Sequence, residues 1–323
     1  MRRAIAGMER HQVALCLAAI AVALVGGWLV PGSERLDVAI EPALVLLLFA
    51  TFLGIPFRRL ADGLRDRRFL AALALVNLVA APVVAFALSR FVAADDALLV
   101  GVLLVLLAPC IDYVIVFAGA AGGSAAKLLS ATPLLMAGQM LILPVCFTLF
   151  LGPRSLAMID PAPFARAFLL MIALPLAAAG VVQLLAPRIR AVRAVERAGH
   201  AVMVPAMMLV LIAVIASQVR AIGGEIRSLW VVIPLFAAFA VAMSAAGACA
   251  SRLLRLDAAD GRAALFSGVT RNSLVVLPLA LALPLPLAPL VVVTQTLVEL
   301  VAMVLLVRLA PRILPARGAD PRR

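Results

Sequence analysis

Long apolar runs recur along the whole chain, and they restrict its fold more than any other feature of the sequence. Residues 69–91 and 229–250 are typical, with one charged residue in the first run and none in the second. A helix needs about 20 mostly apolar residues to cross the hydrocarbon core of a bilayer. Hydrophobic residues make up 66% of the 323 residues and charged residues only 14%, whereas soluble domains are about 25% charged. The sequence therefore predicts an all-α integral membrane protein.

The spacing of these runs predicts ten transmembrane helices in one transporter domain, residues 1–323. Closely spaced Pro284, Pro286 and Pro289 predict a tight turn before the last helix. The first five spans form one repeat (about 12–151), the last five a second (about 165–309), and residues 310–323 a basic tail. The predicted spans are 12–30, 38–56, 69–91, 98–120, 128–151, 165–186, 200–219, 229–250, 263–284 and 287–309.

Basic residues between the runs report the orientation of the chain. Of 28 lysines and arginines, 20 fall on one side of the predicted membrane and six on the other. The positive-inside rule places the richer side in the cytoplasm, so we expect a multi-pass protein of the cell inner (plasma) membrane with both termini cytoplasmic. Because the basic residues lie in short clusters between apolar runs, the net charge of +12 does not indicate nucleic-acid binding.

Five spans per half force the two halves into opposite orientations, which predicts a 5+5 inverted repeat with a binding site at mid-membrane. Asp112 and Asn272 are 160 positions apart, as are Gln139 and Glu299. Pro109 interrupts span four, and four consecutive polar residues (270–273) interrupt span nine. We therefore expect helices four and nine to be discontinuous and to cross at the site.

Three charged residues are expected deep in the bilayer: Asp112, Arg271 and Glu299. Each costs about 2.5–3.5 kcal/mol there, and such residues usually mark ion or substrate pathways. Arg271 is either an anion-binding group or a fixed cation that balances the two acids, and a buried ion pair that only fixes helix packing is the structural alternative. Gln295 and Glu299 share a helix face, and a carboxyl group buried in this way could carry a proton.

The predicted site consists of polar and interrupting residues in the same spans. Its substrate-binding members are Cys110, Asp112, Arg271, Asn272 and Glu299, and its lining is Pro109, Tyr113, Gln139, Thr270, Ser273 and Gln295. Asn77 and Ser244 are expected to form hydrogen bonds between helices. The four cysteines lack CxxC spacing, and the chain contains no P-loop and no HExxH motif. We therefore expect neither an enzyme nor a bound cofactor.

Two short motifs carry a resemblance to a known family. Ala108-Pro109-Cys110 in the interrupted fourth span and Leu297-Val298-Glu299 in the tenth resemble the arsenite-efflux permeases of the bile acid/sodium symporter superfamily. The resemblance covers essentially the whole chain in span count and layout. It implies a core domain and a panel domain, with discontinuous helices four and nine crossing at the substrate site.

The resemblance also implies roles for two residues. Cys110 stands at the family's important cysteine, a candidate thiol ligand for As(III), and Glu299 at its membrane-embedded glutamate. Soft ligands select soft centres, and one thiol gives a reversible contact. The chain departs from the family at Ile111, where threonine is frequent, and at Arg271-Asn272-Ser273-Leu274, where asparagines followed by a sodium-binding glutamate are common. We therefore expect H⁺ rather than Na⁺ as the coupling ion, carried by Asp112 or Glu299.

Three functions remain open from the sequence. The first is efflux of arsenite or antimonite driven by the proton motive force. The second is uptake of an organic anion, with Arg271 binding a carboxylate or sulfonate. The third is a membrane protein that does not transport, such as an intramembrane enzyme or a scaffold. The expected partners are the lipid bilayer and a small metalloid or organic anion, and the sequence does not define an oligomeric state.

Overall fold

The structure is a computed structural model that describes residues 12–54, 66–110, 114–157, 166 and 169–316. Within these ranges the backbone is almost entirely helical, which confirms the all-α prediction. The chain divides into two compact units, and each takes segments from both halves of the sequence. Unit 1 comprises Met1–Ile55, Asp160–Leu229 and Leu277–Leu283, and unit 2 comprises Pro56–Ile159, Trp230–Val276 and Pro284–Arg323.

Several helices are long and apolar enough to cross a membrane. In the described ranges, four helical stretches meet this condition: Ser33–Gly54, Arg67–Val92, Arg227–Leu253 and Leu287–Ile313. A fifth is the bent pair Arg190–Gly199 and Ala201–Ser217, with 41° between its two parts. All five overlap predicted spans, and they support an integral membrane protein. The count of ten spans in two inverted repeats stays a prediction.

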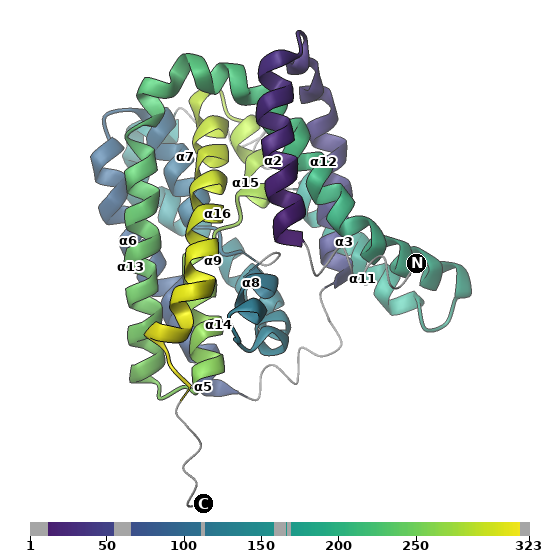
Figure 1. Cartoon of the computed structure of the whole chain (residues 1–323), viewed down its shortest axis with the longest axis vertical. Coiled ribbons are helices and arrows are strands. Elements are labelled where there is room, and N and C mark those ends of the chain that lie inside the picture. The colour runs from purple at the N-terminus through teal and green to yellow at the C-terminus, as the bar shows by residue number, and fades with distance from the viewer. Residues whose placement is uncertain (1–11, 55–65, 111–113, 158–165, 167–168, 317–323) are drawn as a thin grey trace, which may run out of the picture. The chain divides into compact units, whose positions relative to one another are not determined.

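Unit 1 is a helical group in which α2 packs along α12 (Figure 1). A Cβ atom added to Gly27 of α2 would lie 2.6 Å from the Cα atom of Ala216 in α12. Glycine therefore lets the two backbones approach closely, as small residues do between membrane helices. The helices are α2 (Gln12–Leu29), η1 (Ser33–Ala39), α3 (Ile40–Gly54), η5 (Leu169–Ala173), α11 (Leu174–Leu185) and α12 (Arg190–Leu229).

Unit 2 contains the two interrupted helices and the long helices packed around them. Helices α13 and α16 run side by side in Figure 1, and α16 also packs on α7. The helix α15 (Ser273–Leu281) begins in unit 2, and its residues from Leu277 belong to unit 1. The other helices are α5 (Arg67–Ala74), η3 (Leu75–Ala80), α6 (Ala81–Ser89), η4 (Arg90–Val92), α7 (Asp96–Leu106), α8 (Val114–Ala120), α9 (Ala125–Ala157), α13 (Val232–Leu253), α14 (Ala258–Val269) and α16 (Leu287–Ile313).

Two π-helical turns, η3 and η5, each stand just before a proline. Pro82 is the second residue of α6, and Pro175 is the second residue of α11. Proline lacks an N–H group and its ring clashes with the carbonyl four residues earlier. A wider turn before it absorbs this misfit, and such bulges recur at functional sites. The turn η3 carries the buried Asn77.

Helix boundaries agree with the sequence at some ends and differ at others. Helix α16 begins at Leu287, the predicted first residue of span ten, and Pro289 lies in its first turn. The helix continues to Ile313, four residues beyond the predicted end, so the first residues assigned to the tail are helical. Helix α12 has 40 residues and includes much of both connections predicted beside span seven. Polar helix ends extend these spans without changing hydropathy in their centres, so an apolar window does not detect them.

Candidate functional site

The two interrupted helices of unit 2 meet where their backbones become extended. Helix α7 ends at Leu106, and α14 ends at Val269 before α15 begins at Ser273. Pro109 and Arg271 form an isolated antiparallel bridge. The amide of Asn272 donates to the carbonyl of Ala108 at 2.7 Å, and the amide of Cys110 donates to that of Thr270 at 3.4 Å. Four main-chain polar groups at the two breaks therefore satisfy each other.

The Arg271 side chain is the largest charged group in this cluster, and none of it is exposed. Its Nη2 atom donates to the carbonyls of Ser267 and Gly268, and Nη1 donates to the carbonyl of Leu106 at 3.4 Å. These carbonyls belong to the C-terminal ends of α14 and α7, which carry partial negative charge. Phe239 of α13 adds a ring whose centroid lies 5.3 Å from the guanidinium carbon. These carbonyls thus place partial negative charge beside the buried cation.

Asn77 links this cation to the π-helical turn of span three. Its Oδ1 atom accepts from Arg271 Nη2 at 3.1 Å, and its Nδ2 atom donates to Ser267 Oγ at 2.9 Å and to the Leu73 carbonyl at 3.1 Å. The expectation of an interhelical hydrogen bond for Asn77 is confirmed. Its place beside Arg271 was not predicted, although a lone asparagine five residues before a proline was a usable signal. Ser244 instead donates to Ala240 in its own helix.

Glu299 of α16 faces the same break and is 3% exposed. Its Oε2 atom accepts from the main-chain amide of Arg271 at 2.7 Å and from Nε2 of Gln295. Close by, the Thr296 hydroxyl contacts Ser273 Oγ at 2.7 Å. Gln295 and Glu299 therefore share one face of α16, as predicted, and Glu299 binds the backbone just before the second half-helix begins.

Asn272 and Gln295 each carry a buried polar atom that lacks a hydrogen-bond partner in the part of the chain that the structure describes. These atoms are Nδ2 of Asn272, a donor, and Oε1 of Gln295, an acceptor. Their residues are 2% and 3% exposed. An unsatisfied buried polar atom costs about 1–3 kcal/mol. The cluster thus offers a donor and an acceptor to a further group.

The remaining predicted site residues divide into three sets. Cys110 is 1% exposed, and Thr270 and Ser273 are also buried, so the structure brings them together with Arg271, Asn272, Gln295 and Glu299. Pro109 is buried in the same break. Asp112 and Tyr113 lie outside the described residues. Gln139 lies in α9, and its side chain is outside what the structure describes.

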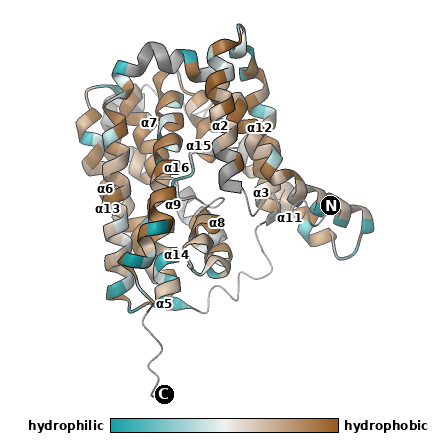
Figure 2. Cartoon of the chain, viewed as in Figure 1, coloured by the Kyte–Doolittle hydropathy of each residue, from teal (hydrophilic) through white to brown (hydrophobic). Residues whose placement is uncertain are grey.

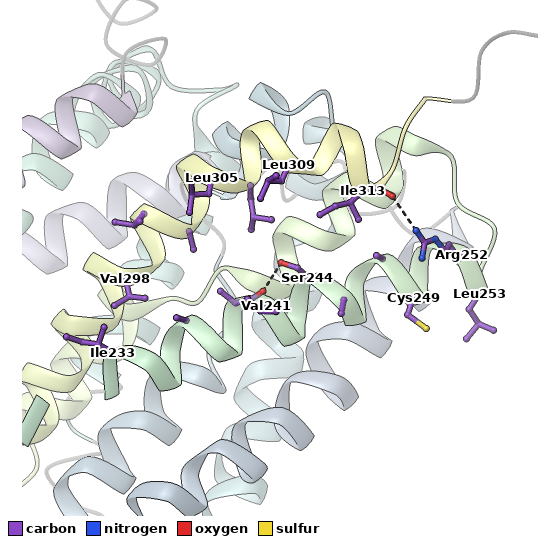
Figure 3. A pocket seen from close by; sticks show the side chains of 17 residues that line it. Ile233, Val241, Ser244, Cys249, Arg252, Leu253, Val298, Leu305, Leu309 and Ile313 are labelled. Atoms are coloured by element: carbon purple, nitrogen blue, oxygen red, sulfur yellow. Dashed lines mark hydrogen bonds between the residues drawn. The ribbon is translucent and has the colours of Figure 1, made fainter. Parts of the chain in front are cut away.

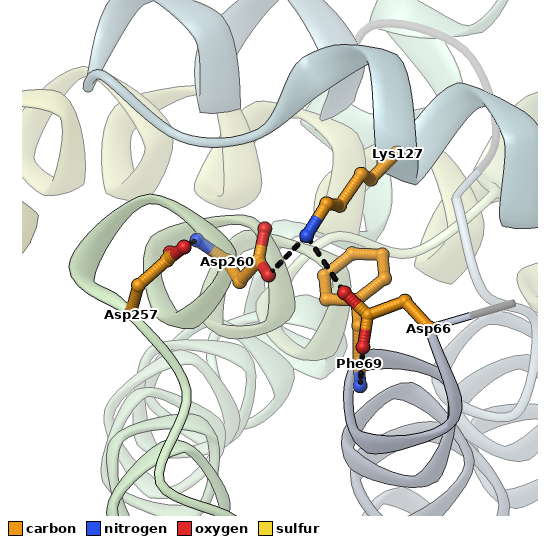
Figure 4. Close-up of polar contacts among 5 residues, drawn as sticks. All are labelled: Asp66, Phe69, Lys127, Asp257 and Asp260. Carbon is orange, nitrogen blue, oxygen red and sulfur yellow. Dashed lines mark hydrogen bonds and ion pairs between the residues drawn. The ribbon is translucent and has the colours of Figure 1, made fainter.

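A second polar cluster, which the sequence analysis missed, joins the N-terminal ends of three helices (Figure 4). Lys127 of α9 donates to Asp260 of α14 at 2.6 Å and to Asp66, the N-cap of α5, at 2.7 Å. Hydrogen bonds to Asp260 and Asp66 raise the pKa of Lys127, and the bond from Lys127 lowers the pKa of Asp66. The cluster therefore ties α5, α9 and α14 together at one end of unit 2.

Comparison with known proteins identifies the family of the chain. The family model described as the Sodium Bile acid symporter family matches residues 41–224, more than half of the chain. Among curated proteins, none matches the chain significantly. The chain therefore belongs to the sodium bile acid symporter family, whose members are membrane transporters.

Proposed function

We propose that this secondary transporter exports arsenite or antimonite and that the proton motive force drives it. The observation that carries the proposal is the thiol of Cys110, buried in the extended break that pairs with Thr270–Asn272. A thiol is the side chain that a soft centre such as As(III) prefers. A break between two half-helices is also where transporters of this architecture bind their substrates.

Neutral arsenous acid matches the chemistry of two polar atoms in the same cluster as this thiol. It carries hydroxyl groups, which both donate and accept, and the cluster offers Nδ2 of Asn272 and Oε1 of Gln295. The Cys110 thiol replaces one hydroxyl of As(OH)₃, giving an S–As bond and one water, and arsenic stays trivalent. Attack by water reverses the step, so a single thiol permits release.

Arg271 acts in this proposal as a tethered cation. Its guanidinium fills the space between the carbonyls of Leu106, Ser267 and Gly268 and the amide oxygen of Asn77. Oxygen ligands of this kind suit hard cations, so a fixed guanidinium takes the place that a mobile cation would need. Among the described residues, Glu299 is then the buried acid at the break that can carry a proton. Asp112 is the other candidate carrier.

The alternative, uptake of an organic anion, needs the Arg271 guanidinium to reach the substrate. That group is wholly buried, and carbonyl oxygens and Asn77 bind it. These hydrogen bonds already engage the guanidinium, which supports a neutral metalloid as the substrate in this proposal.

A metalloid-sensitivity assay tests the proposal in a host stripped of its own efflux systems. Cys110→Ser should abolish resistance to arsenite, because a hydroxyl is a poor ligand for As(III). Cys146→Ser is the matched control, because Cys146 is also buried in unit 2 but lies in α9, and it should keep full resistance. Full resistance in Cys110→Ser at equal protein level would overturn the proposal.

A further inference from the structure

A long apolar groove runs along unit 2 between α13 and α16 (Figure 3). Its volume is about 1160 Å³, and its lining is almost wholly aliphatic, including Val241, Ala245, Val301 and Leu305. Val241 is 71% exposed and Val301 is 62% exposed. Figure 2 shows hydrophobic residues along both helices and hydrophilic residues gathered near the end of α13 and α14. The groove therefore offers a surface for hydrocarbon.

One end of this groove opens into a polar hollow. Arg252 and Ile313 line both the groove and the hollow, so the two are continuous. Arg255, Asp257 and the first residues of α14 complete the hollow. Figure 3 places Arg252 at this end, where Nη2 donates to the Ile313 carbonyl at 3.5 Å. The combined site is apolar along its length and basic at one end.

Arg255 adopts a backbone conformation that favours glycine. Its φ angle is +51°, the only positive value among the described residues that are not glycine. The amide of Leu256 donates to the Ser251 carbonyl at 2.9 Å, and that of Arg255 to the Arg252 carbonyl at 3.2 Å. These bonds define a helix end whose left-handed residue is usually glycine. A strained residue of this kind is a candidate for a functional role.

The charges around the hollow favour an anion. Two guanidinium groups, which bind phosphate through paired hydrogen bonds, join the N-terminal end of α14, which attracts negative charge. Asp257 opposes them, but its Oδ1 atom already accepts from the amide of Asp260 at 2.7 Å. The stretch of α13 from Ile233 to Arg252 is about 28 Å long at 1.5 Å per residue, enough for an acyl chain.

We propose that this site binds one anionic phospholipid, with an acyl chain in the groove and the phosphate between Arg252 and Arg255. The basic end lies on the side that the charge bias predicts to be cytoplasmic, where anionic lipids attract basic residues. This proposal is independent of the transported substrate.

Native mass spectrometry of the purified protein tests the headgroup contacts. With phosphatidylglycerol added, the wild-type protein should retain one lipid at least tenfold more strongly than with phosphatidylcholine. The double variant Arg252→Gln, Arg255→Gln should lose this difference. Equal retention of the two lipids by the wild-type protein would overturn the proposal, and so would an unchanged double variant. Retention of free glycerol phosphate as strong as that of phosphatidylglycerol would also overturn it, because a small anion would then be the ligand.

The variant Arg255→Gly separates ligand binding from folding. Glycine adopts the left-handed conformation without strain, so this variant should unfold at the same or a higher temperature in detergent without lipid. It should nevertheless lose most of the stabilisation that phosphatidylglycerol gives. Full stabilisation of Arg255→Gly by this lipid contradicts a role for the Arg255 charge.

Filling the groove tests the acyl chain. Ala245→Trp should lower phosphatidylglycerol retention at least tenfold without changing any charge. Val83→Trp is the matched control, because Val83 is 63% exposed on α6 and does not line the groove, and it should retain the lipid. If Ala245→Trp instead changes the oligomeric state and leaves lipid retention intact, the groove is a protein interface and the proposal is wrong.

Discussion

The main-chain amide of Arg271 donates to the carboxyl group of Glu299 at 2.7 Å, across the point where the second interrupted helix changes direction. The same residue turns its guanidinium toward the ends of α7 and α14. One residue therefore binds the candidate proton carrier through its backbone and supplies the fixed positive charge through its side chain. In the proposed mechanism, a change in the protonation of Glu299 would act directly on the extended break that holds Cys110.

The Glu299 carboxyl group gives the first prediction. Glu299→Gln keeps an oxygen that accepts from the Arg271 amide but cannot carry a proton. In proteoliposomes, arsenite accumulation driven by a pH gradient should fall at least tenfold, whereas exchange of arsenite at equal concentrations on both sides should continue. The exchange assay is the control, because it needs binding and movement without coupling.

The outcome also separates the coupling ions. Accumulation that follows a sodium gradient and ignores pH would contradict proton coupling. Undiminished pH-driven accumulation in Glu299→Gln would exclude Glu299 as the proton carrier and leave Asp112 as the remaining expected carrier.

The carbonyls of Leu106, Ser267 and Gly268 and the amide oxygen of Asn77 form a cage around the Arg271 guanidinium. This cage gives the second prediction. Arg271→Ala leaves three carbonyls and the Asn77 amide oxygen without their donor, and a buried polar group left unsatisfied costs about 1–3 kcal/mol. The variant should therefore unfold at a clearly lower temperature. Guanidinium at millimolar concentration should recover part of the loss, because it has the charge and shape of the missing group. Urea is the control, since it has a similar planar shape without charge, and equal recovery with urea would contradict the cage.

Much of this site could be predicted from the sequence because its signals are local. Pro109 and the polar residues 270–273 marked the two breaks, and the structure interrupts both segments there. The direction of the Arg271 side chain could not be predicted, because its partners Asn77 and Leu106 lie 194 and 165 positions away. A search for apolar runs treats Lys127 only as one of the basic residues that report the orientation of the chain. Tertiary packing nevertheless places two carboxylates beside it.

The Lys127 cluster gives the third prediction, which concerns pH. The pKa of Asp66 is lowered from its ordinary value of 3.8, so its contribution to stability is present above that value. It is lost as the pH falls through the lowered pKa. The pKa of Lys127 is raised from 10.5, so its contribution is complete below 10.5 and disappears only at higher pH. The unfolding temperature should thus change little because of this cluster between about pH 5 and 9 and decline below about pH 4.

Two variants separate the partners in this cluster. Lys127→Met leaves Asp260, whose side chain is 6% exposed, without its cation. Its cost should exceed that of Asp66→Asn, because Asp66 is 36% exposed and exposed pairs contribute about 0–1 kcal/mol. Thermal unfolding across pH measures both variants, and Asp66→Asn should show a weaker acid decline. Equal losses in the two variants would contradict the buried role of Asp260.

Two neighbouring glycines in α2 give the last prediction. A Cβ atom at Gly27 would lie 2.6 Å from the Cα and carbonyl oxygen of Ala216, whereas one at Gly26 would meet nothing within 4 Å. Gly27→Ala must therefore push α2 away from α12, and overpacking of this kind costs about 1–3 kcal/mol. Gly26→Ala should be neutral or slightly stabilising, since alanine favours helices over glycine by up to about 1 kcal/mol. Thermal unfolding of the two purified variants checks this contrast, and equal losses would mean that the close approach of α2 and α12 is absent.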